Sequence, residues 1–251
     1  MFNPELETKK IIQFIQDYFE KCHLGGIVIG ISGGKDSAVA AALFTKALGP
    51  ERVIGVTMPC HSIPEDRNDA IKVADFYHFK LINVDLTNTF DTFHQEVEQL
   101  EDFVESEDSN INIKPRLRMS TLYYIAQMVS KKEQKTYIVS GNGNKCEEYV
   151  GYFTKGGDSV SDIKLLADFT VEEVIQLGEV LEVPKEVLYK APSDGISQKT
   201  DEDKLGVSYK DIAKVIHGEE VEKEVLDKIT KMHNGCAHKF NIPTYRRDEN
   251  K

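Results

Sequence analysis

The stretch GIVIGISGGKDSAVAAALFTKALGP, residues 26–50, decides the fold. Its apolar run at residues 27–31 is typical of a strand that is covered on both faces. The chain then bends through Ser32-Gly33-Gly34-Lys35-Asp36-Ser37 and becomes alanine-rich. We expect the alanine-rich part to be a helix that ends at Gly49-Pro50, because glycine and proline commonly close helices. The sequence therefore predicts a strand, a tight loop and a helix.

The rest of the chain repeats this alternation of strands and helices. Further apolar segments predict strands at residues 53–57, 81–84 and 137–140 and a short one at 163–166, with a helix at 64–76 between two of them. Such alternation is typical of a parallel sheet with right-handed crossovers. We therefore expect an α/β fold: a Rossmann-like parallel sheet of about five strands with helices on both faces.

The last part of the chain has a helical pattern. A capping box begins a helix at Thr170, and we expect helices at residues 208–217, closed by Gly218, and 222–233, closed by Gly235. These last two form a small C-terminal helical annex in our interpretation. Because the sequence contains neither internal repeats nor a linker rich in Pro, Ser or Gly, we expect a single domain over residues 1–251.

The composition narrows the class of protein. The formal net charge is −11, which argues against a protein that neutralises a nucleic-acid backbone. The sequence shows neither a signal peptide nor an apolar run of about 18 residues, so we expect no membrane association. Cys22, Cys60, Cys146 and Cys236 are widely spaced, which favours reduced thiols in the cytoplasm over a metal or disulfide motif.

An acidic segment interrupts the α/β pattern. Residues 91–110 contain eight carboxylates and no Lys or Arg. Their spacing is unlike that of metal ligands, so we expect a solvated helix face followed by a mobile loop.

The loop at residues 32–37 has the residue types of an anion-binding site but matches neither of the two common phosphate-binding motifs. A Walker A loop would need glycine at Ile29 and a hydroxyl at Asp36, and the dinucleotide pattern G-x-G-x-x-G is absent. Backbone N–H groups in a tight turn, followed by a helix N-terminus, still favour phosphate. An aspartate beside phosphate makes sense where Mg²⁺ lies between them. Helix capping by Asp36 and Ser37 is the alternative, but it does not explain Ser32 and the two glycines.

The six residues SGGKDS resemble the signature of the N-type ATP pyrophosphatases. The later blocks NIKPRLRMSTLYYIA (112–126), SGNGNKCEEYVGYFTKGGDSVSDI (140–163), KAPSDGISQKTDEDKLGVSY (190–209) and AHKF (237–240) resemble, in this order, the ammonia-dependent NAD synthetases. The resemblance covers roughly residues 10–242. It implies that ATP adenylates the carboxylate of nicotinic acid adenine dinucleotide (deamido-NAD) and that ammonia then displaces AMP to give NAD. It also implies a homodimer with the dinucleotide near the subunit interface.

The resemblance assigns roles to individual positions. It implies that ATP is held by Gly30, Ile31, Ser32, Gly33, Gly34, Lys35, Asp36, Ser37 and Ser193, and Mg²⁺ by Asp36 and Glu147. It implies that deamido-NAD is held by Arg116, Lys155, Asp162, His238 and Lys239. Asp36, Lys155 and Asp162 are the expected catalytic residues, and Asp162 or Asp158 is a candidate acceptor for the proton of ammonium.

The residue types agree with these roles, although each position has an ordinary alternative. Arg116 follows Pro115 at an expected helix start, where a bound anion would rationalise a cation beside a positive helix end; a solvated helix face is the alternative. Lys155 and Asp162 flank a glycine loop that could close over a ligand, or could be an ordinary surface loop. His238 and Lys239 could equally belong to a solvated tail.

Two positions depart from the family pattern. Asn142 stands where the family usually has threonine, and Val171 stands where it usually has a lysine on the ATP phosphates. Asparagine keeps a donor and an acceptor, whereas valine cannot replace a cation. Lys35 or Lys164 could supply the missing charge.

Two other functions remain open on the sequence. Another N-type ATP pyrophosphatase, such as a tRNA-modifying enzyme, would be expected to carry basic surface and catalytic cysteine pairs. A nucleotide sensor that has lost catalysis would account for Val171 and Asn142, but not for the retention of Asp36 and Glu147. The sequence shows no glutaminase-like block, so we expect free ammonia as the nitrogen source.

Overall fold

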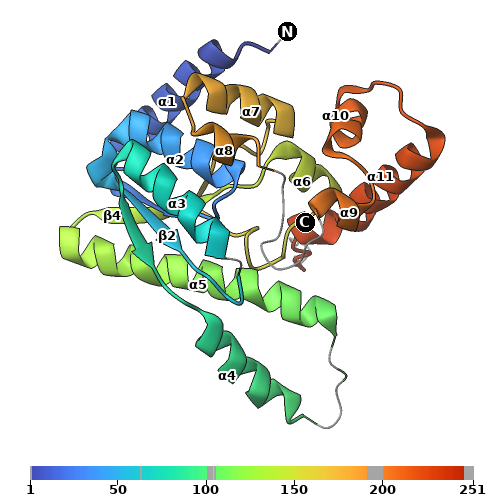
Figure 1. Ribbon diagram of the computed structural model, residues 1–251, viewed down its shortest axis with the longest axis horizontal. Helices are drawn as coiled ribbons and strands as arrows, with labels where there is room; N and C mark the ends of the chain where they lie inside the picture. The colour runs from blue at the N-terminus through green and yellow to red at the C-terminus, as the bar shows by residue number, and fades with distance from the viewer. Residues whose placement is uncertain (1, 63, 101–103, 105, 191–199, 246–251) are drawn as a thin grey trace, which may run out of the picture.

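The computed structural model describes residues 2–62, 64–100, 104, 106–190 and 200–245. Helices and strands alternate through the first two thirds of the chain, and helices alone follow (Figure 1). The elements in order are α1 (Pro4–Lys21), β1 (Leu24–Gly30), α2 (Lys35–Leu48), a 3-10 turn (Pro50–Arg52), β2 (Val53–Thr57), α3 (Pro64–Tyr77), β3 (Lys80–Asn83), α4 (Thr87–Glu98), α5 (Glu107–Glu133), β4 (Thr136–Gly141), α6 (Lys145–Val150), β5 (Ile163–Lys164), α7 (Val171–Val180), α8 (Lys185–Leu188), α9 (Asp201–Leu205), α10 (Tyr209–His217), α11 (Lys223–Gly235) and α12 (Ala237–Phe240).

The described strands form one parallel sheet in the order β3-β2-β1-β4-β5. In the register of the central strands, Ile27 pairs with Val53 on one side and with Ile138 on the other. The predicted five-stranded parallel sheet is thereby confirmed, and the fifth strand is even shorter than expected, with two residues.

Helices cover both faces of the sheet, as predicted. Side chains alternate along β1, so Ile27 and Ile29 pack against α1, α2, α7 and α8, whereas Val28 packs on the opposite face with residues of α4 and α5. Residues 27–29 are fully buried, which is why this strand reads as a continuous apolar run rather than an alternating one.

The strand order creates a switch point beside β1. The chain runs outward from β1 to β2 and β3, and then returns to place β4 on the other side of β1. Loops that follow β1 and β4 therefore leave the sheet in opposite directions and open a crevice at the carboxyl ends of these two strands. The loop at residues 31–34 borders this crevice on one side, and residues 142–143 border it on the other.

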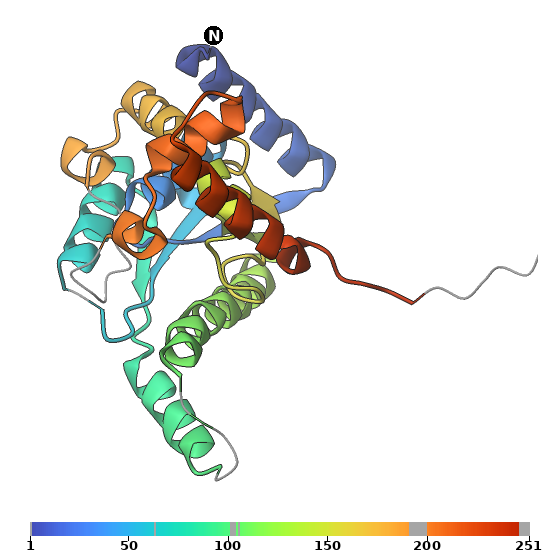
Figure 2. The same ribbon diagram turned by 90° about the vertical axis from the view of Figure 1, so that its right-hand side faces the viewer.

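The predicted C-terminal annex is present. Its core combines Leu205, Ile212 and Ile229 with Cys146 and Val150 of α6, so α6 joins the annex to the sheet domain. The annex lies to one side of the sheet (Figure 1), and residues 241–245 extend away from the body (Figure 2). Ser208 caps α10, and Gly218 closes it as expected. Gly235 was expected to end the last long helix, but it is the final residue of α11, and Cys236 caps that helix.

The acidic segment is more helical than predicted. The expected helix is present as α4, but residues 107–110 form the first turn of α5 rather than part of a loop. Ser106 caps α5 by accepting a 3.1 Å hydrogen bond from the N–H of Ser109. Glu107 and Asp108 are favoured there because carboxylates stabilise the positive end of a helix. Residues 101–103 and 105 lie outside the described part.

The expected helix start at Pro115 is wrong, because Pro115 lies in the interior of α5. Arg116 consequently lies in the middle of a 27-residue helix and gains nothing from a helix N-terminus.

Across the described ranges, we find no helix with the length and apolar character needed to cross a bilayer.

Candidate active site

The crevice beside β1 is a pocket of about 400 Å³. It is bordered by the loop after β1, the ends of β2 and β4, one side of α5, and parts of the chain after α6. All eight predicted ATP-loop residues contribute to its wall: Gly30, Ile31, Ser32, Gly33, Gly34, Lys35, Asp36 and Ser37. Ser193, the ninth predicted ATP residue, lies outside the described residues.

Hydrogen bonds within the loop fix its shape. Ser32 Oγ accepts a 3.2 Å bond from the N–H of Gly34. Ser37 Oγ accepts a 3.2 Å bond from the N–H of Ser32 and donates to the carbonyl of Gly34 at 3.0 Å. Gly33 has φ +83°, a conformation that glycine adopts without strain. The loop therefore presents a tight turn directly before the N-terminus of α2, which is the arrangement that favours an anion.

Asp36 and Glu147 face the same pocket from two different elements. Asn144 connects them: its side-chain amide donates to Asp36 Oδ1 at 3.3 Å, and its backbone N–H donates to Glu147 Oε2 at 3.1 Å. Asn144 is fully buried and also caps α6 in a capping box with Glu147. The capping box that begins α6 thus places one carboxylate opposite the other.

The electrostatics of this pair favour a cation. Burial, and next the charge of Asp36, raise the pKa of Glu147 well above its ordinary value of 4.5. Lys35 Nζ lies 3.1 Å from Asp36 Oδ2 and is 6 % exposed. Burial lowers the pKa of Lys35, but the charges of Asp36 and Glu147 outweigh it and leave that pKa raised. Lys35 is therefore a firmly charged group within the pocket.

One side of α5 forms the apolar wall of the pocket. Pro115, Met119 and Leu122 recur at the spacing of one helix face, and all three line the pocket. Arg118 shares this wall and holds the loop after β2, since its Nε donates to the carbonyl of Met58 at 3.2 Å. The apolar surface and the polar loop face one another, as in most small-molecule sites.

The segment after α6 closes the pocket on the far side. Gly157 is pressed against α5: a Cβ there would lie 2.9 Å from Pro115 Cβ. Asp158 follows, lines the pocket, and accepts a 2.8 Å bond from the N–H of Thr154. Desolvation raises the pKa of Asp158, but the residue is exposed, so this desolvation is only partial.

Four of the five residues predicted to hold the dinucleotide lie together outside this pocket. Arg116 Nε donates to the carbonyl of Lys155 at 3.2 Å, and Lys155 Nζ donates to the carbonyl of His238. Lys239 Nζ donates to the carbonyls of Gly151 and Phe153, each at 2.7 Å. These residues join α5, the segment after α6 and α12, but in the described structure they do not line the pocket.

Asp162, the fifth of these residues, is separate from the other four. Its Oδ2 accepts a 2.7 Å bond from the N–H of Val139, and its Oδ1 accepts a 3.2 Å bond from the hydroxyl of Tyr123. Burial, and next the charge of Asp162, raise the pKa of Tyr123 to about 12, so this hydroxyl remains a donor. Both oxygens of Asp162 are thus engaged with β4 and α5.

The two departures from the family pattern have different surroundings. Asn142 takes part in the site: its amide donates to the carbonyl of Gly30 at 3.0 Å, and it accepts from Ser140 Oγ at 3.0 Å. Val171 begins α7 and packs against the annex core. Of the two proposed sources of charge, Lys35 lines the pocket, whereas Lys164 is paired with Glu148 and lies over the ring of Phe153.

Sequence reasoning missed three residues that border the pocket, Arg118, Lys190 and Asp201, and one that holds its carboxylates, Asn144. All four lie within the quoted blocks, but none was assigned a role. Asn144 could have been found, because an asparagine three residues before a glutamate is the signature of a capping box. Lys190, Arg118 and Asp201 left no local signal, since their neighbours in the pocket come from distant segments.

Comparisons with known proteins identify the family and the fold. The model of the family described as NAD synthase matches residues 7–243. An NH(3)-dependent NAD(+) synthetase of Carboxydothermus hydrogenoformans is 36% identical over 242 residues, 96% of this chain and 97% of the relative. Another, from Methanococcoides burtonii, is 42% identical over 210 residues, 82% of this chain and 76% of the relative. The solved structure of an NMN synthetase from Francisella tularensis has a TM-score of 0.89 and 33% identity, and the match covers 98% of this chain and 99% of that one.

Proposed function

Since the chain belongs to the NAD synthase family, we propose that it uses ATP to join ammonia to the carboxylate of deamido-NAD, giving NAD, AMP and pyrophosphate. The observation that carries this proposal is the pocket that unites the SGGKDS loop with Asp36 and Glu147. The loop favours a triphosphate, α5 supplies an apolar wall, and the carboxylates of Asp36 and Glu147 line the same pocket.

The donor set fits Mg²⁺. Carboxylate oxygens suit this ion, which usually takes one or two of them together with waters and phosphate oxygens. Within the described ranges, no three His, Cys, Asp or Glu side chains come together as a complete metal site, which agrees with an ion that phosphate helps to hold. Asp36 and Glu147 would hold it, and its charge would offset that of the triphosphate and the leaving pyrophosphate.

The remaining chemistry needs little more than positioning. The loop amides and Lys35 hold the triphosphate so that its α-phosphorus faces the carboxylate of the substrate. That carboxylate attacks, the bond to pyrophosphate breaks, and an acyl-adenylate forms. Ammonium then loses a proton, ammonia attacks the acyl carbon, and AMP leaves. The apolar wall formed by Pro115, Met119 and Leu122 excludes water that would hydrolyse the adenylate.

The proton acceptor for ammonium is Asp158 rather than Asp162 in this proposal. Asp158 lines the pocket, and its raised pKa makes it a stronger proton acceptor than an ordinary aspartate. Asp162 instead spends both oxygens on Val139 and Tyr123. We assign Asp162, with Arg116, Lys155, His238 and Lys239, to binding of the dinucleotide outside the ATP pocket.

We also propose a homodimer and a cytoplasmic location. Tyr124 and Met128, one turn apart on α5, are 67% and 58% exposed, as expected of a face that a second copy covers. Met128→Glu should convert a dimer into a monomer in analytical ultracentrifugation, whereas a monomeric parent protein would contradict the proposal.

The cytoplasmic location rests on the four unpaired thiols. Because α7 packs in the sheet core through Val174 and Leu177 and against the annex core through Val171, we propose that residues 1–251 act as one domain.

The function is tested by incubating the protein with ATP, Mg²⁺, ammonium and deamido-NAD. We expect NAD, AMP and pyrophosphate in equal amounts, and no NAD without ammonium. The likeness to an enzyme named for NMN makes the deamidated mononucleotide the second substrate to test, and a higher kcat/KM for it would reassign the substrate. ATP binding without turnover of either substrate would favour the sensor, and salt-sensitive micromolar tRNA binding would favour the tRNA-modifying enzyme.

A further inference from the structure

Lys190 connects two parts of the molecule that are far apart in the sequence. It follows α8, and its ammonium donates to Asp66 Oδ1 at 2.8 Å and to Asp69 Oδ2 at 2.7 Å. Both aspartates belong to the first two turns of α3. The side chains are only 27%, 21% and 12% exposed, so these charge-assisted bonds are shielded from water. Lys190 therefore fixes the beginning of α3.

The beginning of α3 contacts the SGGKDS loop (residues 32–37) directly. A Cβ on Gly33 would lie 2.3 Å from the backbone carbonyl oxygen of Asp66, so the two backbones are in close contact there. Gly33, Asp66 and Lys190 all line the same pocket. A shift of the first turn of α3 must therefore either push Gly33 or open a gap beside it.

We propose that Lys190 is a positioning residue for ATP, which holds the first turn of α3 against the SGGKDS loop and so sets the position of the loop amides. This proposal rests on the proposed use of the loop for ATP. The physical requirement is strict, because donors must lie within a few tenths of an ångström of their place to hold phosphate oxygens well. Lys190 also offsets the negative charge of Asp66, and shares with Lys72 that of Asp69, beside an anion site.

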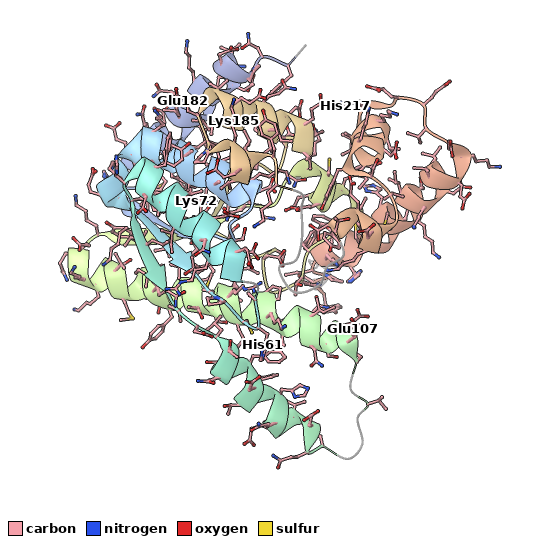
Figure 3. The ribbon with its side chains drawn as sticks, in the orientation of Figure 1. His61, Lys72, Glu107, Glu182, Lys185 and His217 are labelled. Atoms are coloured by element: carbon pink, nitrogen blue, oxygen red, sulfur yellow. The ribbon has the colours of Figure 1, made fainter. Side chains whose placement is uncertain are left out.

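Lys72 provides a matched control within the same cluster. Its ammonium donates to the other oxygen of Asp69 at 3.0 Å, but Lys72 belongs to α3 itself and is 49% exposed (Figure 3). Removing Lys72 takes one positive charge from Asp69 without detaching α3 from any other element. The pair of lysines thus separates loss of charge from loss of the connection between α3 and the segment after α8.

The test measures binding of Mg-ATP by isothermal titration calorimetry, with neither deamido-NAD nor ammonium present. Lys190→Met should raise Kd about tenfold or more, the loss expected for a shielded charged hydrogen bond, whereas Lys72→Met should stay within about twofold. Lys190→Arg keeps the cation and should retain most of the affinity, which guards against a trivial folding defect in the methionine variant. An unchanged Kd in Lys190→Met overturns the proposal.

A double variant distinguishes positioning from direct contact with phosphate. If Lys190 acts through α3, Asp66→Asn with Asp69→Asn should weaken Mg-ATP binding about as much as Lys190→Met, and adding Lys190→Met should change little more. If Lys190 instead acts on the phosphates, removing two negative charges beside them should tighten binding, which also overturns the proposal. Because the readout is ATP binding, an absence of NAD synthesis would contradict the proposed function and leave this result standing.

Discussion

Gly33 and Gly34 are neighbours in the SGGKDS loop, but the structure constrains them differently. Gly34 has φ −98°, and within 4 Å a Cβ there would meet, among the described residues, only Ser32 Oγ at 3.4 Å. A methyl group at Gly34 thus fits the fold and projects into pocket space. Gly33 has φ +83°, and a Cβ there would lie 2.3 Å from the carbonyl oxygen of Asp66. Alanine substitutions at these two positions therefore separate folding from ATP binding.

The expected magnitudes follow from these contacts. Gly33→Ala forces a left-handed conformation that costs about 1–2 kcal/mol, and the clash with Asp66 adds to it. With a total of at least about 2 kcal/mol, the Tm should fall by roughly 4–8 °C at 2–4 °C per kcal/mol. Gly34→Ala loses only the modest preference for glycine over alanine at a helix N-cap, so its Tm should fall by less than about 4 °C.

Binding of Mg-ATP should show a different pattern from stability. The methyl group of Gly34→Ala lies where phosphate oxygens approach the loop amides, so Kd should rise at least about tenfold, or about 1.4 kcal/mol. Differential scanning fluorimetry measures the Tm and calorimetry measures Kd on the same samples. If Gly34→Ala binds Mg-ATP as tightly as the parent protein, the triphosphate does not lie against this loop, and the assignment of the site is refuted.

Three other substitutions or modifications test the site. Glu147→Gln should raise the Tm of the metal-free protein by about 2–4 °C at pH 7.5, because a carboxyl whose folded pKa is raised destabilises the fold above that pKa. This gain in Tm should vanish as the pH falls towards 4.5. A gain at all pH values would contradict this cause. The same variant should lose NAD synthesis. Asp36→Ala should reduce kcat at least about a hundredfold while the Tm changes by only a few degrees, since a residue in the first helical turn contributes about 1 kcal/mol; equal loss of folding and activity would make Asp36 structural. Iodoacetamide at pH 7.5 should modify exposed Cys22 first, because burial raises the pKa of Cys146 to about 11, and mass spectrometry of tryptic peptides would reveal any other order.

The sheet and the SGGKDS loop were predictable because the residues that determine their backbone conformation are close together in the sequence. A strand buried on both faces must be apolar at every position, and the turn after it must contain residues that tolerate its geometry. Residues 27–34 meet both conditions within eight positions. The helix caps at Asn3, Thr170 and Ser208 were likewise recognisable, since each side chain bonds to a backbone N–H within three residues.

The beginning of α5 was not predictable in the same way. Proline usually marks a helix boundary because it lacks the N–H that the preceding turn requires. At Pro115 the packing decides otherwise, since Gly157 is in close contact with that turn. The signal for the true start, Ser106 followed by Glu107 and Asp108, was hidden in an acidic run that equally fits a solvated loop.

The arrangement of the proposed dinucleotide residues depends on contacts between distant segments. Lys239 donates to the carbonyls of Gly151 and Phe153, Lys155 donates to that of His238, and Arg116 donates to that of Lys155. In this structure these cationic side chains bond to backbone carbonyls of neighbouring segments. Through them α12 holds the segment that carries Gly157 and Asp158 in place beside α5. A dinucleotide that takes these cations for its phosphates must exchange the carbonyl contacts for stronger charge-assisted ones. We therefore expect binding of the second substrate to change the position of Asp158 on the wall of the ATP pocket, because the same short segment carries both Lys155 and Asp158.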